Sequence, residues 1–521
     1  MEELINIYSN ILPTIPHFIN ALFTVEMLIA LTVGVVGGMI IGSLPGLNAT
    51  TGIILLMPLT YSMSPIPALT MLMAIYTAGI LGGSFASILI NTPGTSSSIA
   101  ALFDGYPMTQ KGEALKALNT SIFSSTIGGI ISALSLIFIA PLLVRLALIF
   151  DSPEYFLLAV LGITLVSSFS SDGLAKGFSI GCMGLLVGSI GLAPMSSVAR
   201  YTLGSELLYD GFNRTVVIIG IFSIAQVMIM TNQIKSSGQN KAVEVAKLIG
   251  NKFLTLQEIK SIMPTILRSS IIGVGVGILP GAGAGTGSFL GYAAAKKSSK
   301  HPELFGTGIM EGVAAPEAAN NAVTGAAMIP LMTLGIPGST AAAVLLGALM
   351  IQGLQPGMTL FTNQAAIAYP IMFGFLVANI IMLPIGLVLS RVMGNIVKIP
   401  EAILAPIIVV LAVLGSFAIR GRVLDIYILI FFGMVGYIMK KAKFATASFT
   451  LGMLLGVMGE AGLRRSLVLS RGDIIGFYFS RPAAVLLILL ILLNMATPLI
   501  KKLTPYIIYR LKTLKYGGNR K

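Results

Sequence analysis

The chain has little of the chemistry on which many enzymes and metalloproteins depend. Its 521 residues hold one cysteine, two histidines and no tryptophan, and only 10% of them are charged. Because Cys182 is alone, the chain can form no internal disulfide and no cysteine-based metal site. His17 and His301 lie far apart in the sequence, which argues against a histidine metal cluster or a Ser-His-Asp triad. We therefore expect no enzymatic activity and no cofactor.

Apolar residues take the place of the missing charge. The chain is 55% hydrophobic, and its charged fraction is well below the roughly 25% of an average soluble protein. Long apolar runs recur, for example at 27–42, 127–143, 216–230 and 483–496. A transmembrane helix needs about 20 mostly apolar residues, and we count about 11–13 such segments, several of them cut by Gly and Pro. The sequence predicts an all-α polytopic membrane protein.

The net charge of +14 is the one feature that would suit nucleic acid. Lys and Arg gather in loops and at the C-terminus, as the positive-inside bias of membrane proteins produces. We therefore expect membrane lipid as a partner and no nucleic acid.

Three motifs recur in the same order in the two halves of the chain. "GSLPGLNATTG" (42–52) resembles "GILPGAGAGTG" (277–287), "NTPGTSSSIAAL" (91–102) resembles "GIPGSTAAAVLL" (335–346), and residues 151–169 resemble 398–417. The matched prolines are offset by 235, 244 and 247 residues. A slowly growing offset indicates two homologous units.

This repeat divides the chain into five parts. They are an N-terminal segment (1–23), repeat 1 (24–195, with its motif and hairpin region at 42–105), a connecting helix with a basic cytoplasmic arm (196–263), repeat 2 (264–440, with its motif and hairpin region at 277–350), and C-terminal membrane helices with a basic tail (441–521). Repeat 1 follows a stretch without Lys or Arg, whereas repeat 2 follows the basic arm. We expect the two repeats to have inverted topology, which is a common transporter plan with the site where the repeats meet.

Four breaks at Gly or Pro occur in matched pairs. A break within a membrane segment frees backbone groups, and it is tolerated where it is buried in protein or lines a watery cavity. A half-helix that starts at a break directs free N–H groups and a positive dipole end at an anion such as a carboxylate. We predict that the substrate binds to Asn48, Thr50, Thr51, Asn91, Thr92, Pro93, Gly94, Thr95, Ser96, Ser97, Gly283, Gly285, Thr286, Pro337, Gly338, Ser339 and Thr340.

The two halves of this predicted site differ in hydroxyl content. We call residues 91–98 the first tip and the matching residues 335–342 the second tip. An isolated serine would be read as a helix cap, but the first tip holds a cluster of hydroxyls. The second repeat replaces most of these hydroxyls with Gly and Ala. Neutral oxygens suit a hard cation, so we expect a Na⁺ site near Asn48, Thr51, Asn91 and Gly335. "GAGAGTG" (281–287) lacks the Lys-Ser/Thr of a P-loop, which disfavours an ATPase.

The segment "EGVAAPEAANNAVTG" (311–325) places carboxylates in an otherwise uncharged stretch. Ionisable groups in membrane helices are costly and indicate function by default. Helical spacing puts Glu317, Asn320, Asn321 and Thr324 on one face, and interhelical hydrogen bonding is the alternative reading. We assign a coupling-ion or cavity role to Glu311, Glu317, Asn320, Asn321 and Thr324, and we expect Asp104 at the membrane interface.

These motifs together resemble the large membrane subunit, TctA, of the tripartite tricarboxylate transporter family. The resemblance covers nearly the whole chain and rests on the motifs at Asn48–Gly52, Asn91–Ser97, Gly281–Gly287, Glu311–Thr324 and Gly335–Thr340. It implies a multi-pass permease of the cell inner (cytoplasmic) membrane that takes up citrate or related carboxylates with an ion gradient and without ATP. It also implies two partners, a small four-helix membrane subunit and a periplasmic or extracellular substrate-binding protein, and it leaves homo-oligomer formation open.

The resemblance agrees with inverted repeats that carry broken helices and re-entrant hairpins, as in elevator-type carriers. As a hypothesis, the moving part holds 42–105 and 277–350, and the scaffold includes helices near 113–145 and 364–392. We expect Na⁺ as the coupling ion, with H⁺ open because Glu311 and Glu317 are titratable.

Other functions fit less well. A standalone carboxylate channel or carrier without a binding protein is the nearest alternative, but a channel needs a continuous pore with a selectivity ring. An intramembrane enzyme would need a nucleophile with its base or a metal cluster. A purely structural scaffold would not need hydroxyl-lined breaks in matched pairs.

Overall fold

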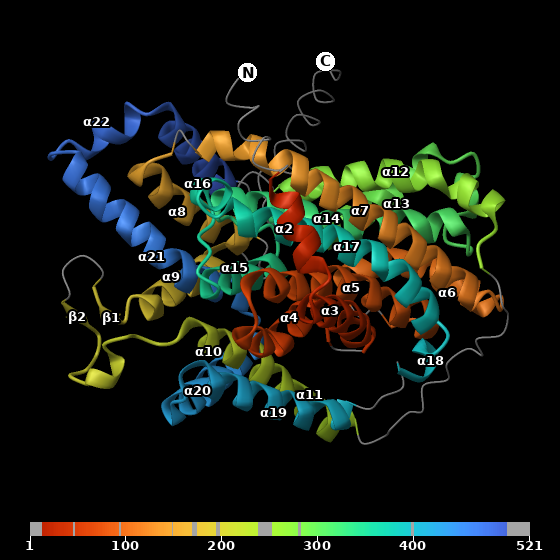
Figure 1. Ribbon diagram of the computed structural model, residues 1–521, viewed down its shortest axis with the longest axis horizontal. Helices are drawn as coiled ribbons and strands as arrows, with labels where there is room; N and C mark the ends of the chain where they lie inside the picture. Colours follow the sequence, from red (N-terminus) through yellow and green to blue (C-terminus); the bar gives the residue numbers. More distant parts are fainter. Residues whose placement is uncertain are drawn as a thin grey trace, which may run out of the picture. The chain divides into compact units, whose positions relative to one another are not determined.

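The chain divides into two units, which are built almost entirely from helices (Figure 1). Unit one comprises residues 1–148 and 213–438, and unit two comprises residues 149–212 and 439–521. The computed structural model describes residues 13–44, 47–92, 95–147, 150–168, 174–193, 198–237, 253–279, 283–396 and 401–496. Most of the predicted basic arm, residues 238–252, lies outside this part of the chain.

Unit one shows the same order of long helices and breaks in its two chain segments. The first segment contains α2 (Thr14–Leu22), α3 (Val25–Ser43), α4 (Ala49–Leu56), η1 (Met57–Ser62), α5 (Pro65–Ile90), η2 (Ser96–Ser98), α6 (Ile99–Gln110) and α7 (Ala114–Ala147). The second contains α10 (Arg214–Ile219), η4 (Gly220–Ile224), α11 (Ala225–Ser237), α12 (Leu256–Ile278), α13 (Gly283–Ser298), η5 (Pro302–Leu304), α14 (Met310–Leu334), α15 (Thr340–Ile351), α16 (Met358–Thr362), α17 (Ala365–Leu389), α18 (Met393–Ile396), α19 (Glu401–Arg420) and α20 (Val423–Lys441).

A helix ends at each of the four breaks that the sequence predicts. The breaks follow α3, α5, α12 and α14, and a new helix begins within a few residues of each. Local chemistry fixes these ends. Asn48 caps α4 by accepting the Thr51 N–H at 2.9 Å, while α5 and α14 end at Asn91 and Gly335 in the left-handed conformation. Asn and Gly tolerate that conformation better than other residues.

Seven helices among the described residues are long and apolar enough to cross a membrane. They are Val25–Ser43, Pro65–Ile90, Ala114–Val144, Arg214–Asn232, Leu256–Ile278, Ala365–Leu389 and Val423–Lys441. Six shorter apolar helices accompany them: Ala49–Ser62, Ser152–Thr164, Ala175–Gly188, Thr340–Ile351, Ala405–Phe417 and Pro482–Ala496. The helical class is confirmed, whereas the count of 11–13 segments and the inverted orientation stay predictions.

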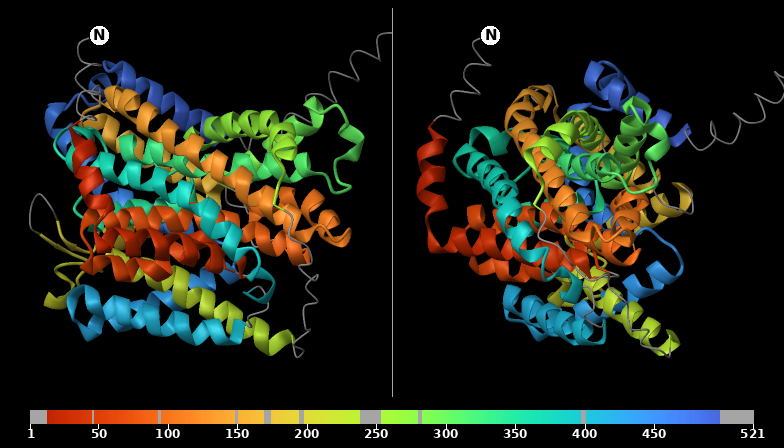
Figure 2. Two further views of the ribbon diagram at one scale, coloured as in Figure 1. Left: turned by 45° about the vertical axis from the view of Figure 1, so that its right-hand side comes forward. Right: turned by 90° about the vertical axis from the view of Figure 1, so that its right-hand side faces the viewer.

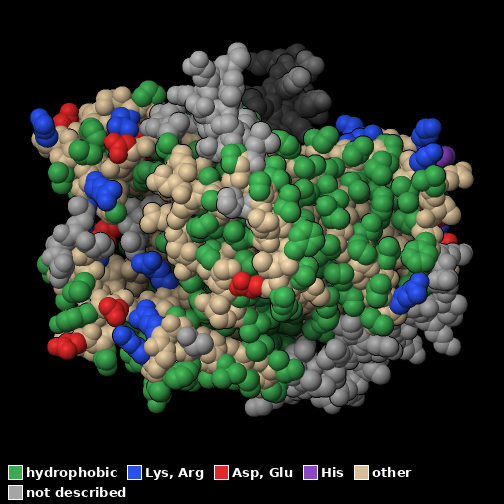
Figure 3. Space-filling view, in the orientation of Figure 1, with side chains coloured by type: hydrophobic (Ala, Val, Ile, Leu, Met, Phe, Trp, Pro, Cys, Tyr) green, Lys and Arg blue, Asp and Glu red, His purple; other side chains and the backbone are tan. Residues whose placement is uncertain are grey.

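The outer face of unit one is apolar. Figure 3 shows hydrophobic side chains spread over the surface around α7 and α17, with Lys and Arg at its borders. Phe138 of α7 and Val388 of α17 are among the exposed large hydrophobic side chains. In water such a patch would be unusually large, whereas lipid is a suitable environment for it.

The core of unit one is a set of helix pairs in which glycine permits close approach. α3 packs against α5, α12 against α14, and α14 against α7, and α10, α11, α19 and α20 form a further layer (Figure 2). A methyl group added at Gly128 of α7 would overlap the Ala318 carbonyl oxygen of α14. Small residues of this kind let helix backbones approach in membrane proteins. α14 is buried around its whole circumference.

Unit two is a smaller helical bundle with a short hairpin. It contains α8 (Ser152–Ser168), α9 (Leu174–Gly188), η3 (Glu206–Leu208), α21 (Thr446–Leu469) and α22 (Ile474–Phe479). β1 (Gly191–Leu192) pairs antiparallel with β2 (Ala199–Arg200), a small exception to the predicted all-α class. The buried Glu154 accepts a hydrogen bond from Arg481 at 2.7 Å.

The packing predicts opposite effects for two glycine substitutions. Gly128→Ala should destabilise unit one by about 1–3 kcal/mol, because the added methyl group forces α7 and α14 apart. Gly275→Ala on α12 meets nothing within 4 Å and should stabilise the helix by about 0.5–1 kcal/mol. Thermal unfolding of the purified protein in detergent measures both. Equal midpoints for the two variants would contradict the close α7–α14 packing.

Candidate functional site

The two repeats contact each other through their motifs. The second break of each repeat lies against the first half-helix of the other repeat. At the first tip, the Ser288 hydroxyl of α13 donates to the Ser97 carbonyl at 2.6 Å. Gly285 of α13 faces Ser96, since a methyl group at Gly285 would lie 3.3 Å from the Ser96 hydroxyl oxygen. The second break of repeat 1 therefore lies against the first half-helix of repeat 2.

The mirror arrangement holds at the second tip. The Tyr76 hydroxyl of α5 is 2.9 Å from the Ser339 hydroxyl, which also caps α15 by accepting the Ala342 N–H. α15 packs against α4, the first half-helix of repeat 1. Each late break thus meets the early half-helix of the opposite repeat. Sequence reasoning matched the breaks by their resemblance and did not foresee this crosswise contact.

The polar residues predicted around α4 are engaged locally. The Asn48 side-chain oxygen accepts hydrogen bonds from both the N–H and the hydroxyl of Thr51. Thr51 is buried, Thr50 is half-buried and Asn48 is exposed. Capping accounts for Asn48, and its oxygen is already used twice in this conformation.

The first tip combines a rigid turn with exposed polar groups. Thr95 and Ser98 form a capping box around η2, and the Thr95 hydroxyl is 2.8 Å from the Ser97 hydroxyl. Ser97 is buried, whereas Asn91, Thr92 and Ser96 are exposed. Pro93 and Gly94 lie outside the described residues.

The second repeat contributes mostly backbone at its breaks. Gly283 begins α13 with a φ of +69°, and Thr286 in the same turn is exposed. Pro337 and Gly338 are buried and Thr340 is exposed. We call the contact between the first tip and α13 the first joint, and the contact of the second tip with α4 and α5 the second joint. The structure places exposed hydroxyl-bearing residues at both, Ser96 and Thr286 at the first joint and Thr340 at the second.

Glu317 is the centre of a second, fully buried polar cluster. Its carboxylate accepts hydrogen bonds from Ser84 of α5 at 2.5 Å and from two serines of α7, Ser121 at 3.0 Å and Ser125 at 2.9 Å. Asn320 lies 3.5 Å away. Three helices from both repeats therefore converge on one carboxylate, and removing it from water without a cation would be costly.

The amides next to Glu317 extend the cluster toward α17. The Thr77 hydroxyl is 3.0 Å from the side-chain oxygen of Asn321 and 2.8 Å from that of Asn379. Asn321 donates to Asn320 at 3.1 Å, while the Thr324 hydroxyl bonds back to its own helix. The predicted helical face is therefore brought together at Glu317, Asn320 and Asn321, but Thr324 turns to the backbone.

Glu311 does not belong to this cluster. It lies in the first turn of α14, is half-buried and accepts the Ser299 hydroxyl at 2.8 Å. A carboxylate is favourable at that helix end because of the dipole. Its surroundings fit a structural role.

Asp104, expected at the membrane interface, is fully buried in this fold. Its carboxylate accepts the N–H groups of Gly306, Gly308 and Ile309 at 2.8–3.1 Å, and the Tyr292 hydroxyl at 2.9 Å. The loop between α13 and α14 is thus fastened to α6, just beyond the first tip.

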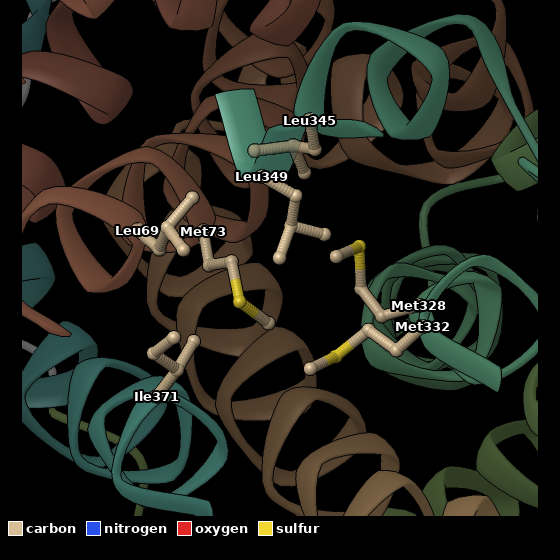
Figure 4. Close-up of a pocket in the computed structure, with 7 residues that line it drawn as sticks. All are labelled: Leu69, Met73, Met328, Met332, Leu345, Leu349 and Ile371. Carbon is tan, nitrogen blue, oxygen red and sulfur yellow. The ribbon is translucent and has the colours of Figure 1, made fainter. Parts of the chain in front are cut away.

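A narrow apolar cavity of about 10 Å³ lies beneath α15 (Figure 4). It is lined by Leu69, Met73, Met328, Met332, Leu345, Leu349 and Ile371. An apolar void of this size stays dry, and flexible methionines can repack around it. The helix that follows the Ser339 tip therefore rests on an adaptable surface.

The sequence did not predict several residues of the tip contacts and of the Glu317 cluster. They are Tyr76, Thr77, Ser84, Ser121, Ser125, Ser288 and Asn379. One signal was available, since "NTSIFSST" (119–126) places hydroxyls and an amide in an otherwise apolar helix. Such residues often bond their own backbone, so the pattern alone did not separate Ser121 and Ser125 from their neighbours.

Comparison with known proteins decides the family. The sequence profile of the Tripartite tricarboxylate transporter TctA family matches residues 28–451. The chain belongs to this family. It is therefore a multi-pass membrane permease of a tripartite transporter, a type that works with a small membrane subunit and a substrate-binding protein. No solved structure matches the chain.

Two relatives of this TctA-family chain come from Agrobacterium vitis. The "uncharacterized 52.8 kDa protein in TAR-I ttuC' 3'region" is 37% identical over 455 residues, which cover 87% of this chain and 90% of the relative. The "uncharacterized protein in TAR-II ttuC' 3'region" is 38% identical over 212 residues, which cover 41% of this chain and 88% of the relative.

Proposed function

We propose that this TctA-family chain imports a carboxylate across the inner membrane by using an ion gradient, with Na⁺ as the expected coupling ion. The substrate is a tricarboxylate, a dicarboxylate or a related organic acid, delivered by the substrate-binding protein. The joint at the first tip carries the proposal. There the N-terminal turn of α13, with exposed Thr286, adjoins the exposed hydroxyl of Ser96.

This joint has the chemistry that a carboxylate needs. Free N–H groups and the positive dipole end of α13 attract an anion, and hydroxyls donate to it without adding a fixed charge. The predicted binding segments contain no Lys or Arg. A site of neutral donors binds the anion and still lets it leave, which a carrier requires.

Reconstitution tests the function directly. The chain, its small membrane subunit and its binding protein are placed in proteoliposomes, and uptake of radiolabelled citrate and dicarboxylates is followed under an imposed Na⁺ gradient. Uptake that requires both the gradient and the binding protein supports the proposal. Uptake without the binding protein identifies a standalone carrier, and uptake driven only by a pH gradient contradicts Na⁺ coupling.

The first tip should matter more than the second for substrate binding. Ser96→Ala removes an exposed hydroxyl at the joint and should raise the apparent KM about tenfold or more, because one donor to the carboxylate is lost, worth about 1.5–3 kcal/mol for a charged partner. Thr340→Ala should have a smaller effect. Ser96 is a cleaner choice than Thr95, whose hydroxyl also holds the turn.

Uptake by the Ser96 and Thr340 variants is compared at matched expression, with the apparent KM for the carboxylate as the decisive quantity. Equal or reversed effects would argue against a hydroxyl-based site at the first tip.

An elevator movement remains part of the proposal, with 42–105 and 277–350 sliding against α17. The expected scaffold also included α7, but α7 packs against the α14 backbone at Gly128 and its serines bond Glu317, so we place α7 with the moving part. The predicted boundary is closely packed, since Gly374 of α17 lies against the Thr70 side chain of α5. In a Cys182→Ser background, a cross-link between Thr70→Cys and Gly374→Cys should abolish uptake, and a reductant should restore it.

The control cross-link joins Ile88→Cys and Gly105→Cys within the proposed moving part. A Cβ atom at Gly105 would lie 3.5 Å from that of Ile88, a spacing that suits a disulfide. This control should transport normally. Full uptake with the Thr70–Gly374 cross-link in place would exclude sliding between α5 and α17.

A further inference from the structure

The environment of the Glu317 carboxylate narrows the coupling-ion or cavity role, which the sequence suggested for five residues, to one carboxylate and its hydroxyl partners. Glu317 is fully buried, and its hydrogen bonds come from neutral groups on α5, α7 and its own helix. Among the residues that the structure describes, no Lys, Arg or His forms an ion pair with it. A single buried negative charge surrounded by neutral oxygens calls for a monovalent cation.

We propose that Glu317 binds the Na⁺ ion that drives transport, with the hydroxyl oxygens of Ser84, Ser121 and Ser125 as its other ligands. This inference rests on the proposed function and locates its coupling ion, away from the earlier expected position near Asn48 and Asn91. Carboxylate and hydroxyl oxygens are hard donors of the kind that hard cations prefer. One carboxylate matches one positive charge, so the loaded cluster is neutral.

The serines can change from donors to ligands without losing their own hydrogen bonds. Each of the three lies inside a helix, where a hydroxyl can donate to the carbonyl one turn earlier. Other hydroxyls of the same region already do so: Thr120 bonds the Lys116 carbonyl at 2.8 Å, and Ser135 bonds the Ile131 carbonyl at 2.8 Å. When the protons of Ser121 and Ser125 turn to the helix backbone, their lone pairs face the cluster.

The number of converging oxygens favours Na⁺ over a proton. A proton needs one carboxylate oxygen and one acceptor, whereas here three hydroxyls from two helices surround the same group. The Asn320 amide nitrogen faces the Glu317 carboxylate at 3.5 Å, while its oxygen accepts from Asn321. A flip of this amide would turn the oxygen toward the cluster. Several oxygen ligands without a second charge form a site for a weakly held alkali cation.

The position of this cluster links the ion to the substrate tips. Ser84 lies on α5, which ends at the Asn91 tip, and Glu317 lies on α14, which ends at the Gly335 tip. An ion shared by Ser84 and Glu317 holds the two tip-bearing helices together. Without the ion, an uncompensated charge remains between them, so ion binding favours the arrangement in which both joints are formed.

Direct binding of Na⁺ by the purified full-length chain tests the site without any carboxylate. NaCl is titrated calorimetrically against a choline chloride reference. The wild type should bind Na⁺, and Glu317→Gln should raise the half-saturating concentration about tenfold or more, the scale seen when groups of a metal site are altered. Ser121→Ala and Ser125→Ala should each cause a smaller increase.

Ser124→Ala is the matched control, because Ser124 is a buried serine on the same helix with no hydrogen bond to Glu317. It should bind Na⁺ as the wild type does. If Glu317→Gln does not fold, the Ser121→Ala/Ser125→Ala double variant, which keeps the carboxylate, provides the same test.

Unchanged Na⁺ affinity in Glu317→Gln, or in the double variant, would overturn the site, as would a wild type that binds no Na⁺. Loss of pH-driven, Na⁺-independent uptake in Glu317→Gln would overturn it in favour of a proton. If Na⁺ binds at Glu317 but the reconstituted complex imports no carboxylate, the proposed function fails and the ion site stands. If import proceeds with unchanged Na⁺ dependence in Glu317→Gln, the ion site fails and the proposed function stands.

Discussion

The structure depends on the backbone contact between α7 and α14. Because Gly128 has no side chain, the α7 backbone lies directly against the Ala318 carbonyl group of α14. This close approach places the α7 serines within reach of a carboxylate on α14, which is buried from Gly312 to Thr333. A wider separation would leave Glu317 without its hydroxyl partners. The same contact ties a helix of the first repeat to a helix of the second, so the polar cluster and the fold have one geometric origin.

The joints at the tips follow from a different constraint. A broken helix exposes polar groups that need partners, and the late break of each repeat finds one in the opposite repeat. Ser97 supplies a carbonyl to Ser288, and Ser339 meets Tyr76. These few bonds leave the neighbouring hydroxyls of Ser96 and Thr340 exposed. Each of the two joints is held by a hydroxyl group of the opposite repeat, Ser288 at one and Tyr76 at the other, while neighbouring exposed side chains make no part of these bonds.

The sequence predicted where the helices break but not which residues contact each break. Gly and Pro act on the chain locally, so the ends of α3, α5, α12 and α14 could be predicted from composition and from the repeat. Glu317 was conspicuous because it interrupts an uncharged stretch. The hydroxyls that surround it were not, since Ser84, Ser121 and Ser125 are ordinary small residues until the helices pack. The partners of Asp104 were hidden for the same reason: three of them are backbone N–H groups of a distant loop, which no residue pattern records.

The hydrogen bonds to the Asp104 carboxylate limit how the sequence of the loop between α13 and α14 can vary. Three of its four donors are backbone N–H groups, of Gly306, Gly308 and Ile309. A backbone donor uses no side chain, so its position along the loop matters. Gly306 and Gly308 are constrained in identity too, because their φ angles of +91° and +99° favour glycine. Exposed positions such as Thr307 are therefore free to change in identity, whereas an insertion or deletion between Tyr292 and Met310 would misalign the donors. Apart from these two glycines, the loop is constrained in length more strictly than in composition.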